Sequence, residues 1–230
     1  MLKTTSRIAG IFMAAVICPV TMAAVIFENT FESSTEGWSA ITTAVGNPST
    51  PVSFASLGNP GGALKHVAPS DNLVSYFISP SSAAIALHSA VGGSVSWEIS
   101  TAKGGAGDTF FSGADVVVRG TGQHVRKRLA SSITLLPVFH TFSTAFSASD
   151  GWEYTSDNVT WAAATQSQIN GVLLGAVRLA FRAEYWSSDN PDTTYLDNVR
   201  ILSSVPDPAS LPLFAIGLVG LAVTRWRSAR

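Results

Sequence analysis

Short runs of alternating polar and apolar residues, divided by turn-forming clusters, limit the folds open to this chain more than any other feature. In residues 94–100, Val95, Trp97 and Ile99 recur at every second position. Because side chains alternate between the two faces of a strand, this spacing predicts a half-buried antiparallel strand with Trp97 in the core. Residues 177–182 repeat the pattern with arginines facing outward. Clusters rich in Gly, Pro, Asn and Asp, such as residues 58–62, separate the runs and predict turns.

Ten such runs together predict the fold class. Many short strands with turn clusters between them, in one domain, indicate an all-β jelly-roll β-sandwich. The predicted strands are residues 38–43, 52–55, 63–68, 73–79, 94–100, 115–119, 124–129, 139–147, 177–186 and 194–202.

One segment, residues 165–174, departs from the strand pattern and predicts one short helix. Thr165 and Gln168 can form a capping box, and Gly175 can end the helix. One helical face carries the apolar residues Ile169, Val172 and Leu173. We expect this face to pack over an end of the sandwich.

The N-terminus has the layout of a secretory signal peptide. Lys3 and Arg7 precede an apolar run over residues 8–20, and small residues follow up to Ala23. The run is shorter than the ~20 apolar residues that a spanning helix needs. We therefore expect residues 1–23 to be a signal peptide that signal peptidase cuts after Ala23, leaving a domain over residues 24–204.

Charge and cysteine content narrow the function of that domain. The chain has 14 Lys and Arg and 15 Asp and Glu, but residues 24–204 hold nine and 14 of them, a formal charge of −5. An acidic domain argues against a nucleic-acid partner, which needs a basic surface, and leaves room for divalent cations. The single cysteine, Cys18, lies in the predicted signal peptide, so the mature protein is expected to have no disulfide.

The C-terminal segment, residues 205–230, has three parts in a fixed order. A hinge comes first, then an apolar run over residues 209–224, and then a basic end. Basic residues resist translocation, so the end is expected to stay on the cytoplasmic side of the inner membrane. The hinge is Val205, Pro206, Asp207 and Pro208, and the basic end carries Arg225, Arg227 and Arg230.

This segment resembles the PEP-CTERM sorting signal of Gram-negative bacteria, in which the hinge is Val-Pro-Glu-Pro. Asp207 stands at the usual Glu position. The resemblance implies an exosortase partner that processes the protein near Pro206–Pro208. The apolar run of 16 residues is ~24 Å long as a helix, short of the ~30 Å membrane core. We therefore expect a transient inner-membrane anchor and later release to the cell surface or the extracellular space; the alternatives are a plain C-terminal anchor or a buried terminal helix.

Several segments follow one another in a recognisable order over residues 27–202. They are residues 27–32 and 36–38, the glycine turn at 58–62, residues 76–80, Gly151 and Trp152, the predicted helix, residues 177–185 and residues 196–199. In this order the chain resembles the laminin B (laminin IV type A) domain, although residues 100–135 match the family poorly. The resemblance implies a jelly-roll sandwich with no known catalytic activity, found in extracellular matrix proteins of animals and bacterial surface proteins.

Carboxylates near the two ends of the domain indicate a calcium site. Many jelly-roll carbohydrate-binding modules bind one Ca²⁺ through an acid on the opening strand and an Asp on the closing strand. Ca²⁺ takes six to eight oxygen ligands, which carboxylates and backbone carbonyls can supply. Glu28, Glu32 and Asp197 stand at the matching positions, and a structural calcium ion could pin the two ends together. The alternative is that Asp197 caps a turn and the glutamates are solvated.

Aromatic residues near predicted loops are candidates for stacking on sugar rings. Trp38 and Trp97 are expected in the core, because large aromatic residues dominate core packing. Trp152, Tyr154, Trp161 and Trp186 lie near predicted loops and are the candidate polysaccharide contacts.

Signatures of catalysis are mostly absent from the sequence. The four histidines are scattered singly, and neither a zinc motif nor a nucleophile elbow occurs. We therefore expect a non-enzymatic, exported surface or extracellular-matrix protein, associated with exopolysaccharide or biofilm. One alternative is a calcium-dependent carbohydrate-binding module. A second is a divergent glycosidase, with Glu98, Glu153 and Glu184 as acids of the required type.

Overall fold

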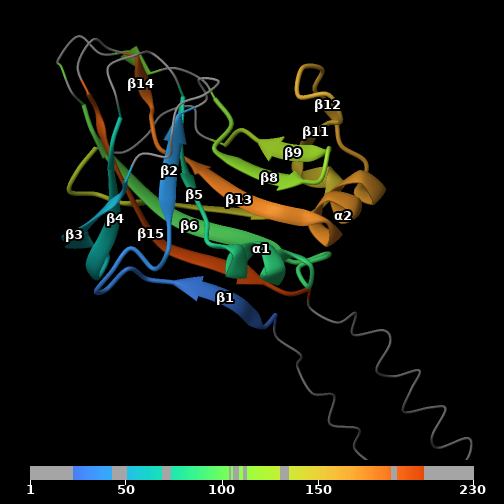
Figure 1. The fold of residues 1–230 in the computed structure, drawn as a ribbon, viewed down its shortest axis with the longest axis horizontal. Helices are drawn as coiled ribbons and strands as arrows, with labels where there is room; N and C mark the ends of the chain where they lie inside the picture. The colour runs from blue at the N-terminus through green and yellow to red at the C-terminus, as the bar shows by residue number, and fades with distance from the viewer. Residues whose placement is uncertain are drawn as a thin grey trace, which may run out of the picture. The chain divides into compact units, whose positions relative to one another are not determined.

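The computed structural model describes residues 23–42, 51–68, 74–103, 105, 109–110, 113–129, 135–187 and 191–204. These residues form the predicted all-β sandwich, a jelly roll (Figure 1). Residues 1–22 of the predicted signal peptide and the predicted sorting signal, residues 205–230, lie outside the described residues. Among the residues that are described, no helix has the length and apolar character needed to cross a membrane.

Sheet A, as far as the chain is described, has six antiparallel strands. Its long central strands β6 and β15 pair over nearly their full length. On its other side, β15 pairs first with β4 and then with β1, so the opening strand lies beside the closing one. The strands in order are β10 (His140–Ala145), β6 (Ser94–Ala102), β15 (Thr193–Leu202), β4 (Gly61–Val67) and β3 (Ser53–Gly58), with β1 (Val25–Asn29) on β15.

Sheet B, counted over the same residues, has seven antiparallel strands. The strands in order are β12 (Ala162–Ala163), β11 (Glu153–Thr155), β9 (His124–Lys127), β8 (Val116–Gly120), β13 (Ala176–Arg182), β5 (Ser75–Ile78) and β2 (Ser39–Thr42). A small separate pair consists of β7 (Thr109–Phe110) and β14 (Trp186–Ser187). All ten predicted runs contain strand, and β1, β7, β11 and β12 lie outside those runs.

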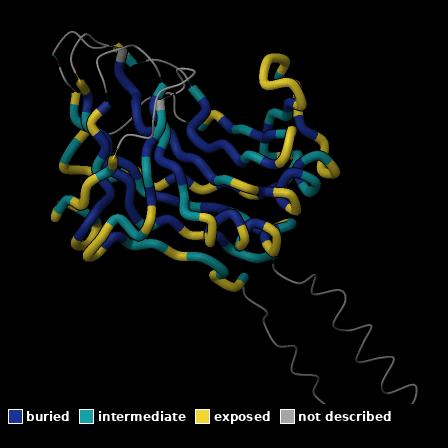
Figure 2. Tube along the Cα trace, viewed as in Figure 1, coloured by how far each residue is buried: buried dark blue, intermediate teal, exposed yellow. Residues whose placement is uncertain are grey.

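Alternating apolar residues of both sheets meet in the main core. Figure 2 shows the buried residues of the chain in dark blue. Val95, Trp97 and Ile99 on β6 are all 0% exposed, which confirms the predicted face. The Trp97 ring lies 4.7 Å from the ring of Phe181 on β13 and 5.4 Å from that of Phe142 on β10, measured between centroids. Burial of side chains of this size dominates the stability of such a core.

The described chain contains two α-helices, so the prediction of one short helix is wrong in number. The predicted helix is α2 (Gln166–Leu174), whose capping box between Thr165 and Gln168 is formed. Its apolar face is buried, as predicted, and it contacts β8 and β9. The missed helix is α1 (Ser81–Leu87), an Ala-rich turn that follows Pro80 and lacks a side-chain cap. A short 3-10 turn, η1, covers Ala148–Asp150.

The β3–β4 hairpin packs closely on the N-terminal segment because two glycines leave room for it. Gly61 has φ +85°, and a Cβ there would lie 1.9 Å from the Glu32 carboxylate. A Cβ at Gly62 would lie 2.1 Å from the carbonyl oxygen of Phe31. Only glycine fits both positions, which brings Glu32 over this hairpin.

Candidate binding face

The outer side of sheet B, here called the B face, carries an unusual set of polar side chains. Val118, Val125 and Leu179 are fully buried in the core. Because side chains alternate along a strand, their neighbours Arg119 and Arg178 point to the opposite side, away from the core. The B face is therefore formed by outward residues of β12, β11, β9, β8, β13 and β5.

Strand register places four of these side chains in one row across the B face. Arg178 on β13 lies directly opposite Arg119 on β8. Arg119 in turn lies opposite His124 on β9, and His124 lies opposite Thr155 on β11. Both arginines are half-buried, whereas His124 is 9% exposed and its Nδ1 has no hydrogen-bond partner in the described part of the chain. Burial, and then the charge of Arg119, lowers the pKa of His124.

A second row contains the only predicted ligand contact that lies on this face. Arg126 on β9 is opposite Glu153 on β11, and its Nε donates to Oε2 of Glu153 at 2.6 Å. The Arg126 guanidinium also lies 3.8 Å from the ring centroid of Trp161, a cation–π contact. Trp161 itself is half-buried, so part of its ring remains open to solvent. This trio combines a planar aromatic group, a fixed cation and a carboxylate.

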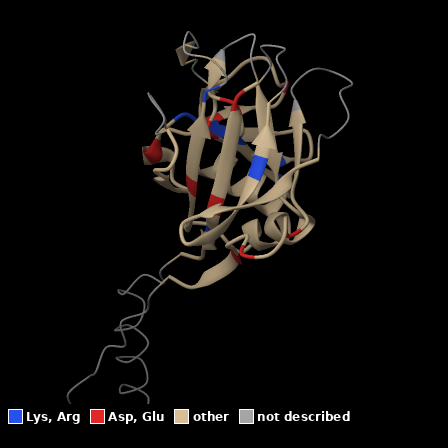
Figure 3. Cartoon of the chain, turned by 90° about the vertical axis from the view of Figure 1, so that its left-hand side faces the viewer, with Lys and Arg blue, Asp and Glu red and all other residues tan. Residues whose placement is uncertain are grey.

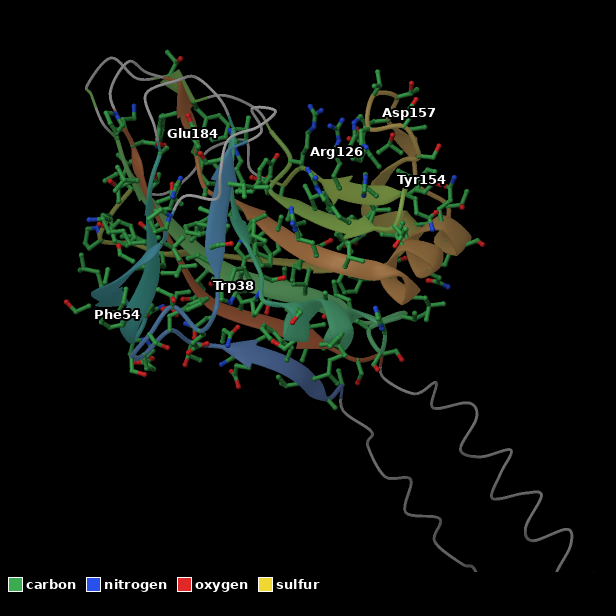
Figure 4. The ribbon with its side chains drawn as sticks, viewed as in Figure 1. Trp38, Phe54, Arg126, Tyr154, Asp157 and Glu184 are labelled. Atoms are coloured by element: carbon green, nitrogen blue, oxygen red, sulfur yellow. The ribbon has the colours of Figure 1, made fainter. Side chains whose placement is uncertain are left out.

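The hairpin between β11 and β12 that carries Trp161 is tied by Asp157 (Figure 4). Its Oδ1 accepts hydrogen bonds from the backbone N–H of Val159 at 2.9 Å and of Thr160 at 2.8 Å. These bonds, and one from the Thr155 hydroxyl, lower the pKa of Asp157. An ionised Asp157 therefore holds the loop that positions the Trp161 ring.

A cluster of buried polar side chains lies at the end of β13, around Arg182. Arg182 was expected to face solvent, but it is 0% exposed. Its Nε donates to the carbonyl oxygen of Glu184 at 2.6 Å, and its Nη1 lies 3.9 Å from Asp115 Oδ1. Its guanidinium also stacks on Tyr185, 4.4 Å from the ring centroid. Arg182 is buried because its charge is paired and its plane is covered by an aromatic ring.

The structure does not bring the four predicted aromatic contacts together. The hypothesis that Trp152 contacts a polysaccharide is wrong, since this side chain is 1% exposed and its Nε1 donates to the Ala145 carbonyl at 2.8 Å. Trp186 is 9% exposed, with the Lys103 ammonium 4.0 Å from its ring centroid and Phe110 against it. Tyr154 packs at the margin of the core. Trp161 alone remains as a candidate for ring stacking.

The outer side of sheet A, here called the A face, carries acidic residues. Figure 3 shows the acidic and basic residues of the molecule from the side on which β3 and β4 lie in Figure 1. Asp197 on β15 lies opposite Glu98 on β6, at the bulge where β15 changes partner from β4 to β1. Asp197 Oδ2 accepts from the Asn59 N–H at 2.7 Å, and Oδ1 accepts from the Asn198 N–H at 2.7 Å. Burial raises the pKa of Asp197 to about 6; those two bonds oppose the rise, and the carboxylates of Glu98 and Glu32 add to it.

The predicted calcium ligands are only partly brought together. Glu28 lies opposite Arg200 and accepts a hydrogen bond from its Nε at 2.6 Å, so it is engaged away from Asp197. Glu98, which the calcium hypothesis did not include, stands opposite Asp197 instead. Within the described residues, no group of three or more His, Cys, Asp or Glu side chains is arranged to hold a metal ion. The residues as placed do not form a calcium cage, and calcium binding stays a prediction.

The acids named for a glycosidase do not form a catalytic pair. Glu153 is held by Arg126 on the B face. Glu184 is 3% exposed, and its Oε2 accepts from the backbone N–H of Ser75 at 3.1 Å. Glu98 lies on the A face and accepts from the amide of Asn198 at 3.1 Å. A retaining or inverting mechanism needs two carboxylates across one cleft, which these three residues do not provide.

Comparison with known proteins supports the fold alone. No family model and no curated protein matches the sequence. Among solved structures, the chain is similar to the L4b domain of human laminin alpha-2, with a TM-score of 0.55 and 13% identity over 77% of this chain and 96% of that chain. A more distant likeness is to the CBM22-1 xylan-binding domain of Paenibacillus barcinonensis Xyn10C, with a TM-score of 0.45 and 12% identity over 81% of this chain and 98% of that one. The laminin match shows that this chain has the jelly-roll fold of a laminin domain, as the sequence resemblance implied.

Proposed function

We propose that this protein is a non-enzymatic, exported surface or matrix protein whose sandwich binds polysaccharide on the B face. The observation that carries the proposal is the trio of Trp161, on the loop held by Asp157, with Arg126 and Glu153 on the adjacent strands β9 and β11. A half-open indole beside an ion-paired guanidinium offers a flat apolar surface with hydrogen-bonding groups at its edge, which suits a sugar ring. The buried or paired state of the candidate catalytic acids supports a binding role over hydrolysis.

Variants on the two faces test this proposal. The full-length chain in mild detergent is run through native gels containing neutral xylan or dextran, or acidic alginate. Trp161→Ala is expected to weaken retardation by a binding polysaccharide roughly tenfold, because the loss of about 1.4 kcal/mol of contact between the sugar ring and the indole raises the dissociation constant tenfold. Phe54→Ala is the matched control, since Phe54 is an exposed aromatic residue on sheet A. Retardation of Trp161→Ala equal to that of the unmodified protein would refute the proposed site.

Export and sorting form the second part of the proposal. We infer that signal peptidase releases the N-terminus at Ala24 and that an exosortase processes the hinge around Asp207. The support is the sequence layout described above. The intact mass of the protein secreted by a host with an exosortase is expected to match a chain from Ala24 to the hinge. A host without the exosortase should retain the C-terminal segment, and an identical mass from both hosts would contradict the sorting proposal.

A further inference from the structure

Two arginines without an acidic partner among the described residues lie side by side on the B face of an acidic domain. Of the nine Lys and Arg in residues 24–204, four are arginines on the B face. Two of them have acidic partners: Arg126 pairs with Glu153, and buried Arg182 lies near Asp115. The other two are Arg119 and Arg178, which form no ion pair with any of the residues described. The uncompensated charge is therefore concentrated on one pair of side chains.

The placement of Arg119 opposite Arg178 is unfavourable for the stability of the fold. Arg119 and Arg178 are directly opposite on antiparallel strands, where like charges destabilise the pairing. Burial, and then the charge of Arg178, lowers the pKa of Arg119. His124, next in the same row, has a buried Nδ1 without a hydrogen-bond partner in the part of the chain that the structure describes. Three groups that can donate to an anion thus lie side by side on rigid strands, and none of them has an acceptor among the described residues.

We propose that Arg119 and Arg178 bind an anionic group of the polysaccharide, a uronate carboxylate or a sulfate, beside the sugar ring that contacts Trp161. This inference rests on the proposed glycan-binding function of the same face. Guanidinium groups recognise both anions through paired, charge-assisted hydrogen bonds. Arg119 is on β8 and Arg126 on β9, adjacent strands ~4.8 Å apart, so the anion subsite and the Trp161 trio can contact one chain.

The test uses the double variant Arg119→Gln/Arg178→Gln in the full-length chain. Its affinity is measured on immobilised alginate, heparin, neutral xylan and single-stranded DNA. We expect affinity for the acidic polysaccharide to fall roughly tenfold or more, because hydrogen bonds to charged groups are strong. Neutral xylan should bind the variant and the unmodified protein equally. The melting temperature should not fall, because the change removes a repulsion.

Arg200→Gln is the matched control, since Arg200 is an exposed arginine on sheet A and its loss changes the net charge in the same direction. Its affinity for the acidic polysaccharide should stay within about twofold of the unmodified protein. Tighter binding to alginate assigns a carboxylate, and tighter binding to heparin assigns a sulfate.

Three results would overturn the anion subsite. They are equal affinities of the double variant and Arg200→Gln, preference of the unmodified protein for xylan, and equally tight binding of single-stranded DNA. Failure to bind any polysaccharide, neutral or acidic, would instead overturn the proposed function itself.

Discussion

His66 and Asp197 are buried titratable residues. Burial shifts the pKa of each in the direction that favours its neutral form. His66 is 1% exposed on β4, 6.0 Å from the Phe77 ring, and neither ring nitrogen has a partner among the residues described. Burial lowers the pKa of His66 to about 4. Asp197 is 0% exposed, with a pKa raised to about 6. Acidification between pH 6.5 and 4 therefore destabilises the fold through His66 and stabilises it through Asp197.

The first prediction isolates the His66 contribution. Above pH 6.5, His66 is neutral in both states and has no effect. Below that, the unfolded chain binds a proton that the folded protein does not accept until about pH 4. His66→Phe should therefore gain about 3 kcal/mol of unfolding free energy relative to the unmodified protein between pH 7 and pH 4. Urea unfolding of both proteins across this range measures the difference, and a difference that is independent of pH would contradict the account.

The second prediction concerns calcium at the acidic A face. If Ca²⁺ binds near Asp197 and Glu32, a concentration ten times the dissociation constant should raise the melting temperature by roughly 3–6 °C, and EDTA should reverse it. The rise should be larger at pH 7 than at pH 5, where Asp197 is mostly protonated. Glu28→Gln should respond as the unmodified protein does, because Glu28 pairs with Arg200. A melting temperature unmoved by calcium at pH 7 would exclude the site.

The alternation of apolar and polar residues predicts whether a single side chain is buried only when that residue lies within a regular strand. Trp97 was placed correctly because its neighbours two positions away are also apolar. Trp152 follows Gly151 in an apparent loop, and nothing local shows that Phe146 and the Ala145 carbonyl cover it. The pairing of the two arginines could not be predicted either. The pattern of its own strand places Arg178 outward, but the register between strands is what puts Arg119 opposite it.

At the scale of elements, α2 shows what a local signal can predict. Its capping box, apolar face and terminal glycine lie within eleven residues, and all three are formed in the structure. α1 lacks such a cap and has only seven residues, so its helical form depends on the burial of Ala83, Ala84 and Leu87 against the sandwich. Tertiary packing, which the sequence does not display, decides helices of that length.

The third prediction tests the cap of α2. The Thr165 hydroxyl accepts from the backbone N–H of Gln168 at 3.3 Å, while the Thr165 N–H donates to the Gln168 side chain at 2.9 Å. Thr165→Ala removes the first bond and should lower the free energy of unfolding by about 1 kcal/mol. Thr165→Ser, which keeps the hydroxyl, should stay within a few tenths of that of the unmodified protein. Equal losses in the two variants, measured by urea unfolding, would show that the methyl group matters rather than the cap.

At the scale of the whole molecule, the two sheets pair different charged residues on their outer sides. Glu98 and the buried Asp197 lie opposite each other on sheet A, whereas Arg119 and Arg178 lie opposite each other on sheet B. The alternating strands predicted the sandwich and its fold class, because both follow from local periodicity. The faces could not be predicted, because strand order and register assign each outward residue its neighbours. The acidic net charge of the domain likewise gives no sign of the two adjacent arginines on sheet B.

The central claim, that the B face binds polysaccharide, is tested most directly by tryptophan indole N–H signals in NMR spectra of the full-length chain during titration with alginate oligosaccharides. The signal of Trp161, half-open beside Arg126, should shift progressively to saturation. The signals of the buried residues Trp97 and Trp152 should not follow it. Saturable binding that leaves the Trp161 signal in place would contradict the account, because the ligand would then bind elsewhere.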